Sequence, residues 1–306
     1  MGKGLNVARI IIDTDIGTNP DDALAISLAV RSPELRVEGI TTAYGKVDVR
    51  ARIARRILEL SGAPEVRVCP GIEEPLLRNR TVRWDGTEGE GLPLPELAET
   101  TEHAVDFIRR TVMDNPGEIT LVTIGPLTNV AVALIREPRL ADHLKEIVMM
   151  GGVTRLGRNG MKLEPVEYNF RCDPEAASIV LRSGVPIVMV GYDVTRQFSV
   201  SRDEFLEMAV AGNELSSTLT RMFQQYLDRM SRDYFYLSDP LTIGCMIDRS
   251  LFRMEAMNVS VLCGQDFPGL TVAEPSDQGR VQVCLEVDKE RFLQLLKNRV
   301  FGQTQP

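Results

Sequence analysis

Short apolar or β-branched runs alternate with longer segments of helical periodicity through the first two thirds of this chain. In the first such pair, residues 7–13 predict a strand and residues 21–32 predict a helix that carries Leu24 and Leu28 on one face. Each repeated unit has the length of one strand plus one crossover helix. Units of this kind fold into a largely parallel sheet covered by helices on both faces. We therefore predict an α/β fold with a largely parallel, doubly wound (Rossmann-like) sheet.

The same reading extends along the chain and indicates one domain over residues 1–306, because no low-complexity linker divides the repeated units. The C-terminal third changes character: residues 201–247 are mainly helical and form cap elements, residues 257–285 are strand-like, and residues 288–301 predict a last helix. The further predicted strands are 36–45, 66–71, 118–125, 144–152 and 185–194, and the further predicted helices are 49–62, 103–117, 127–138 and 173–184.

Composition narrows the function classes. The net charge of -8 argues against nucleic acid or an anionic membrane surface as a partner. The sequence shows neither a secretory signal nor an apolar window of the ~20 residues that a membrane span needs, so we expect a soluble cytoplasmic protein. The five cysteines are odd in number and scattered, which indicates free thiols instead of a disulfide framework or a zinc site.

Four aspartates follow or flank the first predicted strand: Asp13, Asp15, Asp21 and Asp22 in "IIDTDIGTNPDDALAI". Ligands of doubly wound sheets bind beyond the carboxyl ends of the strands. Asp21 and Asp22 have an alternative role as favourable charges at a helix N-terminus capped by Asn19. That role does not explain Asp13 and Asp15, whose alternate positions direct both side chains to the same side of the sheet.

Carboxylates that converge on one point repel one another unless a cation or protons intervene. Oxygen is the ligand atom of this cluster, and no histidine or cysteine lies nearby in the sequence. Ca²⁺ or Mg²⁺ is therefore expected before zinc, and Ca²⁺ accepts the ~6 to 8 irregular oxygen ligands that loops and backbone carbonyls provide.

The opening motif and five later ones together resemble the inosine-uridine preferring nucleoside hydrolase family, which hydrolyses the N-glycosidic bond of ribonucleosides with a tightly bound calcium ion. The later motifs occur in the family's order: "GITTAYG" at 39–45, "GPLTNVA" at 125–131, "VMMGG" at 148–152, "EYNFRCDPEAA" at 167–177 and "SDPL" at 238–241. The resemblance covers nearly the whole chain. It implies a Ca²⁺-dependent N-ribohydrolase of nucleoside salvage that acts on a small-molecule nucleoside and assembles as a homodimer or homotetramer.

The resemblance also assigns roles to single residues. Asp15 is expected to bind calcium and to take a proton from the attacking water, and Asp13 to support it from behind. The remaining expected calcium ligands are Asp22, Asp239 and the backbone carbonyl of Ile124; the residues expected to bind or line the sugar are Asp21, Met150, Asn159, Glu167, Asn169 and Asp239. Without the family pattern, Asp239 is better explained as a helix cap. Glu167 and Asn169 could then form a solvated loop, and "GPLTN" a strand-to-helix turn in which Thr128 or Asn129 binds backbone donors.

The sequence departs from the family pattern at the base end of the site. Ser238 stands where several members carry a histidine, and His103 and His143 lie in predicted amphipathic helices, so we do not expect a histidine acid. We therefore expect Trp84, Tyr234 or Tyr236 to stack on the base, or one of the tyrosines to donate a proton to it. The alternative for each of these residues is aromatic packing in the core.

Two further departures concern the sugar end. The opening motif is two residues longer than the common form, which makes Asn19 a further candidate for the site. Lys46 replaces an asparagine of the pattern; it would pair with Asp48, bind an anionic substituent or point outward.

Two other functions fit part of the sequence. A nucleoside- or sugar-binding protein would keep the metal and ribose site with weak or no hydrolase activity, which Ser238 and Lys46 make a real alternative. A Mg²⁺-dependent phosphatase would use Asp13 as nucleophile, but such loops usually carry Thr or Val where this chain has Gly17. The preference between purine and pyrimidine bases is not readable from the sequence.

Overall fold

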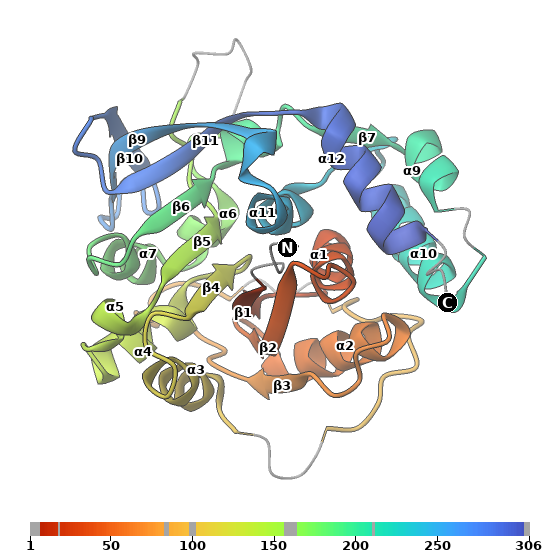
Figure 1. Cartoon of the computed structure of the whole chain (residues 1–306), viewed down its shortest axis with the longest axis horizontal. Coiled ribbons are helices and arrows are strands. Elements are labelled where there is room, and N and C mark those ends of the chain that lie inside the picture. Colours follow the sequence, from red (N-terminus) through yellow and green to blue (C-terminus); the bar gives the residue numbers. More distant parts are fainter. Residues whose placement is uncertain are drawn as a thin grey trace, which may run out of the picture.

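The computed structural model describes residues 7–17, 19–82, 86–97, 102–155, 164–209 and 212–302. Its centre is a nine-stranded sheet in the order β10-β9-β11-β6-β5-β4-β1-β2-β3 (Figure 1). These strands are β1 (Ala8–Thr14), β2 (Leu35–Thr42), β3 (Arg67–Pro70), β4 (Ile119–Thr123), β5 (Glu146–Met150), β6 (Ile187–Val190), β9 (Phe252–Val261), β10 (Thr271–Pro275) and β11 (Val281–Val287). Two short strands, β7 (Ser199–Ser201) and β8 (Tyr234–Tyr236), form a separate antiparallel pair.

The predicted sheet is confirmed, with one addition at its edge. Every neighbouring pair from β11 to β3 is parallel, whereas β9 runs antiparallel to both β10 and β11. The connection 262–270 joins β9 and β10 as a hairpin, and the connection 276–280 leads from β10 to β11, which pairs with β9 and not with β10. The strand-like C-terminal segment therefore extends the sheet as an antiparallel edge.

Helices cover both faces of the sheet, as the alternating sequence predicts. Figure 1 shows α1, α2 and α11 on one face, and α3, α4 and α7 on the other. The helices are α1 (Asp21–Val30), α2 (Val47–Leu60), α3 (Ala104–Met113), α4 (Thr128–Arg136), α5 (Leu140–His143), α6 (Tyr168–Cys172), α7 (Pro174–Leu181), α8 (Tyr192–Thr195), α9 (Arg202–Met208), α10 (Glu214–Met230), α11 (Ser238–Ile247) and α12 (Lys289–Leu296), with short turns η1 (Arg249–Leu251) and η2 (Lys297–Phe301).

The first strand is apolar at consecutive positions because both of its faces are buried. Ile10 and Ile12 belong to the core shared with α1, α2 and the C-terminal helices, and Ile11 belongs to the core under α3, α4 and α7. This burial explains why the run shows no alternation of apolar and polar residues.

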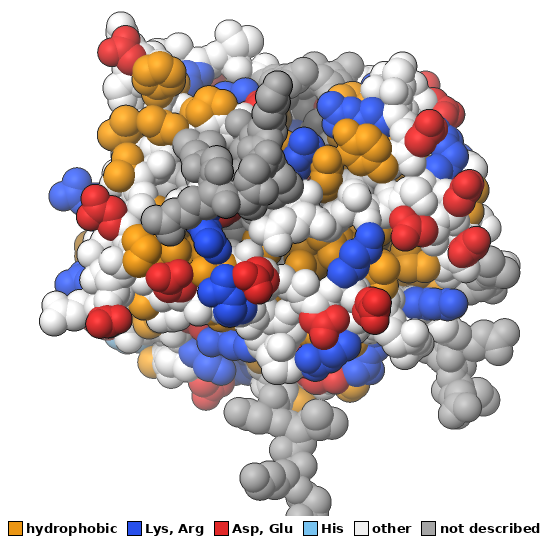
Figure 2. Space-filling view, turned by 90° about the horizontal axis from the view of Figure 1, so that it is seen from above, with side chains coloured by type: hydrophobic (Ala, Val, Ile, Leu, Met, Phe, Trp, Pro, Cys, Tyr) orange, Lys and Arg blue, Asp and Glu red, His pale blue; other side chains and the backbone are white. Residues whose placement is uncertain are grey.

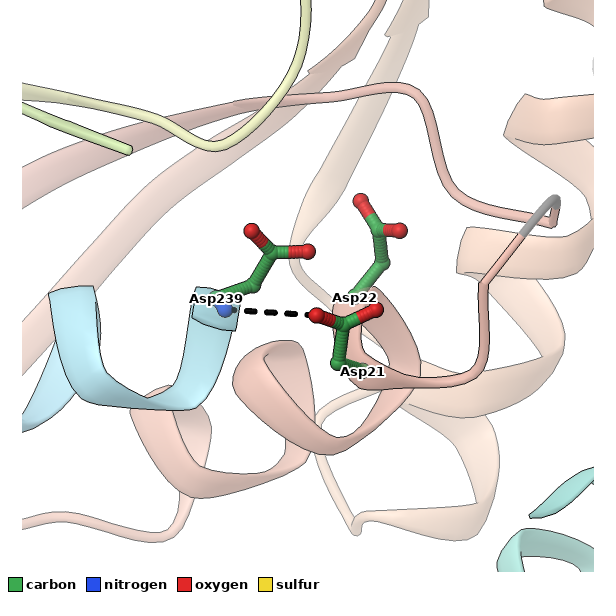
Figure 3. Close-up of side chains that lie close together, drawn as sticks. All are labelled: Asp21, Asp22 and Asp239. Atoms are coloured by element: carbon green, nitrogen blue, oxygen red, sulfur yellow. Dashed lines mark hydrogen bonds between the residues drawn. The ribbon is translucent and has the colours of Figure 1, made fainter. Parts of the chain in front are cut away.

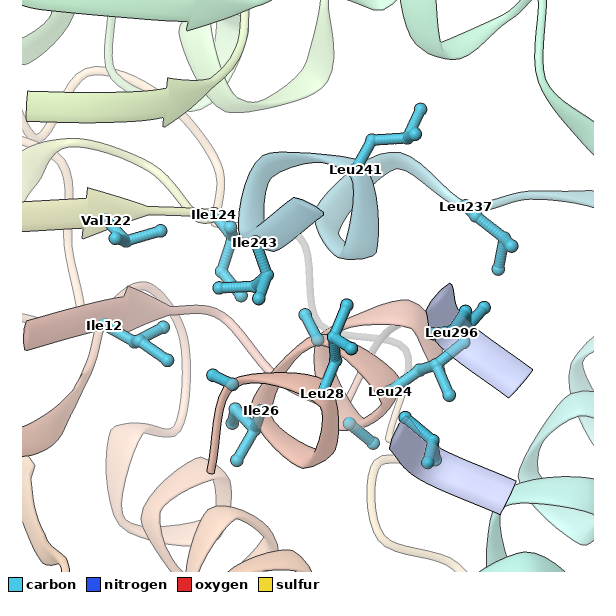
Figure 4. Close-up of a cluster of buried hydrophobic side chains, with 14 of the residues drawn as sticks. Ile12, Leu24, Ile26, Leu28, Val122, Ile124, Leu237, Leu241, Ile243 and Leu296 are labelled. Atoms are coloured by element: carbon cyan, nitrogen blue, oxygen red, sulfur yellow. The ribbon is translucent and has the colours of Figure 1, made fainter. Parts of the chain in front are cut away.

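The core between α1 and α11 joins two segments that are distant in the sequence. Leu24 and Leu28 of α1 belong to the same core cluster as Ile243 of α11 and Ile124 after β4, and Leu24 lies beside Leu296 of α12 (Figure 4). This packing holds the N-termini of α1 and α11 side by side. It therefore fixes the relative position of the acidic residues that begin the two helices.

One helix start differs from the sequence prediction. Asn19 does not cap α1: the position before the helix is Pro20, and no side-chain hydrogen bond caps this end. The predicted helix over 21–32 also ends at Val30, where Arg31 begins to leave helical geometry. The N–H groups at the start of α1 are thus left for other partners.

The remaining composition-based expectations concern thiols, membranes and surface charge. All five cysteines are free thiols. Within the ranges that the structure describes, no helix is both long and apolar enough to cross a bilayer. On the face drawn in Figure 2, the basic and acidic side chains of the described residues are intermingled. A continuous basic stripe is what nucleic-acid binding would require.

Leu28→Ala tests the packing of α1 against α11. Leu28 is fully buried in this core, so its truncation leaves a cavity and is expected to lower the free energy of unfolding by about 2–5 kcal/mol. Denaturant unfolding of the two proteins measures this difference. Val272→Ala on strand β10, where the side chain is 42% exposed, serves as the control and is expected to change the value by less than about 0.5 kcal/mol. Equal effects of the two substitutions would contradict the assigned packing.

Candidate active site

The carboxyl ends of β1 and β4 meet at the centre of the sheet. The chain leaves β1 toward α1 on one face and β4 toward α4 on the other (Figure 1), and the residues Asp15 and Ile124 that follow the two strands line one cavity. The ends approach closely because Gly125 has no side chain: a Cβ there would lie 2.7 Å from the Asp15 nitrogen and 3.0 Å from Asp15 Oδ1. The glycine of the "GPLTN" motif therefore brings Asp15 and Ile124 together.

Three buried carboxylates from two helices converge beside this crevice. Carboxylate oxygens of Asp21, Asp22 and Asp239 lie within 4.8 Å of one another, and none of these residues is more than 5% exposed (Figure 3). The backbone N–H of Asp239 donates to Asp21 Oδ2 at 3.4 Å, and Thr14 Oγ1 donates to Asp22 Oδ1 at 2.5 Å. All three acids occupy the first turn of α1 or α11, where the helix dipole favours negative charge.

Asp15 lies next to these acids without belonging to the closest group of three. It lines the same cavity, and its charge raises the pKa of Asp21, Asp22 and Asp239. Burial raises the pKa of Asp15 itself, while the positive charge of Arg50 lowers it. The pKa of Asp15 is raised overall, and Arg50 offsets part of the effect of burial.

Arg50 is fully buried under the site and was not predicted from the sequence. It donates from Nε to the carbonyl of Tyr44 at 2.6 Å, and from Nη1 to the carbonyl of Ile16 at 2.9 Å and to that of Asp15. These bonds hold the turn after β1 against the start of α2. The signal was present in the sequence: Arg50 occupies the apolar face of α2, in helical register with Val47 and Ala54.

The cluster cannot hold its charge without help. Burial, followed by repulsion among the carboxylates, raises the pKa of Asp22 and Asp239 well above the usual range and that of Asp21 to about 7. In addition, the buried Asp21 Oδ1 has no hydrogen-bond partner in the described part of the chain. A cluster of carboxylate oxygens, one of which lacks a hydrogen-bond partner, fits a divalent cation such as Ca²⁺ or Mg²⁺.

Asp13 lies outside this group of three carboxylates and is bound by side chains of neighbouring segments. Its Oδ1 accepts hydrogen bonds from Thr41 Oγ1 at 2.5 Å and from Asn129 Nδ2 at 2.8 Å, and burial raises its pKa to about 7. Asn129 also donates to the carbonyl of Thr42 and accepts from the N–H of Ile72. Asn129 therefore binds a backbone donor, as expected if "GPLTN" forms a turn. Its bonds to Asp13 and Thr42 also connect strand β1 to strand β2.

Glu167 and Asn169 connect the ends of β4 and β5 to the cavity. The Glu167 carboxylate caps α6, accepting the N–H of Asn169 at 2.8 Å and that of Gly152 at 3.2 Å, and burial raises its pKa to about 7. The Asn169 amide donates to the carbonyls of Ile124 at 3.2 Å and Met150 at 3.3 Å. Both side chains are therefore held rigidly and do not form a solvated loop.

These residues line one cavity of about 270 Å³, close to the lower end of the usual size of small-molecule sites. Its floor is acidic and its mouth is aromatic and basic. The floor is lined by Asp15, Asp21, Asp22, Ile124, Met150, Glu167, Asn169 and Asp239, and the mouth by Tyr192, Arg196, Tyr226, Arg229, Arg232, Tyr234 and Tyr236. Asn19 and Ser238 also reach the cavity.

Several residues named from the sequence lie elsewhere. Trp84 and Asn159 fall outside the described residues. Lys46 is exposed and is not among the described residues that line the cavity. Neither histidine lines the described part of the cavity: His103 caps α3, and His143 contacts the carbonyl of Arg139.

Comparisons with known proteins place this arrangement among nucleoside hydrolases. The family model described as inosine-uridine preferring nucleoside hydrolase matches residues 10–294. The pyrimidine-specific ribonucleoside hydrolase RihA of Citrobacter koseri is 32% identical over 308 residues, which cover 95% of this chain and 97% of that protein. Two solved structures, each 30% identical, cover 96% of this chain: the plant nucleoside hydrolase PpNRh1 (TM-score 0.83, 99% of that chain) and a purine-preferring ribonucleoside hydrolase from Gardnerella vaginalis (TM-score 0.82, 98% of that chain).

Asp21→Asn tests the repulsion within the cluster. The pKa of Asp21 is about 7 in the folded protein, compared with the ordinary value of 3.8 that applies to the unfolded chain. Between these two pH values the carboxyl group is protonated in the folded state and ionised in the unfolded state. This contribution to stability is complete below pH ~4 and is lost as the pH rises to 7. In chelator-treated protein at pH 7.5, we therefore expect Asp21→Asn to raise the free energy of unfolding by about 1–3 kcal/mol.

The measurement is denaturant unfolding of both proteins between pH 4.5 and 7.5, and the stabilisation by the substitution is expected to shrink toward the acid end. Asp277→Asn replaces an exposed aspartate and is expected to change stability by less than about 0.5 kcal/mol at every pH. A destabilising effect of Asp21→Asn at pH 7.5 would show that the cluster is not under electrostatic strain.

Proposed function

Because the chain belongs to the inosine-uridine preferring nucleoside hydrolase family, we propose that it hydrolyses the N-glycosidic bond of ribonucleosides with Ca²⁺ as cofactor, releasing ribose and the free base. The observation that carries this proposal is the convergence of Asp21, Asp22 and Asp239 beside Asp15 at the floor of the cavity. Enzymes of this kind need a general base, charge stabilisation and a sugar-binding surface in one place.

In this proposal Asp15, Asp22, Asp239 and the carbonyl of Ile124 hold the ion. The carbonyl accepts one hydrogen bond from Asn169 and retains a second lone pair for a metal. When bound, Ca²⁺ lowers the pKa of a neighbouring water and binds the vicinal hydroxyls of the ribose. The raised pKa values of the cluster support a cation at this position, because they record how poorly the acids tolerate their own charge.

Asp15 is the proposed general base. It takes a proton from the attacking water, and the positive charge of Arg50 favours the ionised carboxylate that this step requires. As the C1′–N bond breaks, positive charge develops on the ribose ring. The surrounding carboxylates of the floor stabilise that charge, and they do so from fixed positions because they are buried and anchored.

The proposed ribose-binding groups are Asp21, Glu167, Asn169 and Asp239, with Met150 packed against the sugar and Asn159 as a further contact. Before any ligand arrives, Glu167 accepts hydrogen bonds from backbone N–H groups and Asn169 donates to a backbone carbonyl. Such preorganisation lowers the entropy lost when the substrate is positioned for attack.

The proposed base-binding groups are Tyr234 and Tyr236 at the mouth, with Trp84 as a further candidate. The ring centroids of Tyr234 and Tyr236 lie 5.4 Å apart and both residues line the cavity. Phe235 between them also lines it, but is buried and packs on Phe223. Similar proteins named as pyrimidine-specific and as purine-preferring share this fold. Base preference therefore depends on the mouth and not on the floor.

Family membership also leads us to infer a single-domain cytoplasmic salvage enzyme that works as a homodimer or homotetramer. Light scattering after size-exclusion chromatography tests the assembly. A monomer of 34.0 kDa at assay concentration would contradict this part of the proposal.

Asp15→Asn tests the catalytic assignment. Release of reducing sugar is followed with inosine, adenosine, guanosine, uridine and cytidine. Wild-type protein is expected to release ribose from at least one of them, and Asp15→Asn to lower kcat by about 10³-fold or more, because the base is lost. Asp203→Asn on the surface of α9 is the control and is expected to retain full activity. Absence of product together with thermal stabilisation by nucleosides would favour a binding protein instead.

Removal of calcium tests the cofactor. Treatment with EGTA is expected to lower Tm and abolish activity, and Ca²⁺ is expected to restore both; saturation at ~1,000 times Kd corresponds to about 4 kcal/mol of stabilisation. Asp22→Asn is expected to lose the Ca²⁺-dependent rise in Tm. The proposal fails at this point if Tm and activity are the same with and without the ion.

A further inference from the structure

Arg196 lies at the mouth of the cavity, opposite the acidic floor. Its guanidinium carbon is 4.0 Å from the centroid of the Tyr236 ring and 5.4 Å from that of the Tyr192 ring, and all three residues line the cavity. Arg196 follows α8, Tyr236 ends β8, and the side chain of Arg196 is half-buried. Two segments distant in the sequence therefore fix a cation at the base end of the site.

The donors of this guanidinium are available to a ligand. Across the described ranges, no ion pair joins Arg196 to a carboxylate. Contact with the face of a ring leaves the planar N–H groups able to donate hydrogen bonds. The other arginines that line the cavity are either more exposed or paired with a carboxylate. Arg229 and Arg232 are exposed, and Arg171 Nη1 lies 3.9 Å from Glu164 Oε2.

The proposed reaction needs a group of this kind. When the C1′–N bond breaks, its electron pair remains on the base nitrogen, and an unassisted nucleobase anion is a poor leaving group. The described part of the mouth carries no histidine to protonate it. An arginine keeps its proton throughout the accessible pH range, so it acts by hydrogen bonding to the departing base and by its charge.

We infer that Arg196 contacts the nucleobase and stabilises the negative charge that develops on the base as the glycosidic bond breaks. This inference rests on the proposed hydrolase reaction. The water oxygen forms the new bond to C1′ and passes one proton to Asp15, and the base anion takes its proton from solvent afterwards. Tyr192 and Tyr236 position the guanidinium and exclude water around it. Arg196 is thus assigned to leaving-group stabilisation, separate from the attack on the sugar.

This role predicts that Arg196 matters only for substrates whose leaving group needs help. The test compares kcat/KM for the best nucleoside substrate with kcat/KM for 4-nitrophenyl β-ribofuranoside, whose nitrophenolate leaves without assistance. Arg196→Gln is expected to lower kcat/KM about 100-fold for the nucleoside and less than about threefold for the nitrophenyl riboside. The ratio of the two values does not depend on how much of each preparation is folded.

Two variants separate this role from the alternatives. Arg229→Gln removes an exposed arginine of the same mouth and is expected to change the ratio less than about threefold, which would exclude a general effect of positive charge. Tyr236→Phe removes the hydroxyl of a proposed base-binding residue but keeps its ring against Arg196, so its loss of nucleoside hydrolysis relative to nitrophenyl riboside hydrolysis is expected to be smaller than that of Arg196→Gln. A selective loss of nucleoside hydrolysis in Tyr236→Phe but not in Arg196→Gln would assign the role to the phenol and overturn the inference.

The remaining outcomes are also decisive. Equal losses for both substrates in Arg196→Gln, or no loss for either, would overturn the inference while leaving the hydrolase reaction intact. Failure of the wild-type protein to release ribose from either substrate would refute the hydrolase reaction itself, and the inference with it.

Discussion

Mutual repulsion among buried carboxylates is the constraint on which the rest of the site depends. Asp15, Asp21, Asp22 and Asp239 are all nearly inaccessible to solvent. Burial raises the pKa of each, and the charge of Asp15 raises the pKa of the other three further. Helix N-termini, a hydroxyl from Thr14 and the buried cation of Arg50 offset part of this cost. A divalent cation would offset the remainder, which links the stability of the fold to its chemistry.

The packing of the molecule explains how such a cluster can form. Asp239 stands far from Asp21 and Asp22 in the sequence, and the apolar contact between α1 and α11 holds the two helix N-termini together. The close approach of Gly125 to Asp15 then adds the end of β4. The acidic floor is therefore built on rigid elements, whereas the mouth that faces the base is built from α8, β8 and α10.

Much of this was predictable from the sequence, because the sheet and the floor have periodic or ordered signals. The alternation of strands and helices predicted the parallel sheet, and the ordered motifs predicted which residues reach the cavity. Arg50 and Arg196 were not predicted: Arg50 binds the carbonyl of Ile16, Arg196 contacts Tyr236, and neither arginine is part of a recognisable motif. The antiparallel edge was missed because strand-like residues alone do not reveal the direction of pairing.

The most direct test of this account is the number of calcium ions bound per chain. Isothermal titration of chelator-treated protein with Ca²⁺ is expected to give one ion per chain, and Asp239→Asn to weaken its binding at least about tenfold because one of three carboxylate ligands is lost. The account would be contradicted by wild-type protein that binds no calcium, or by Asp239→Asn that binds it with unchanged affinity.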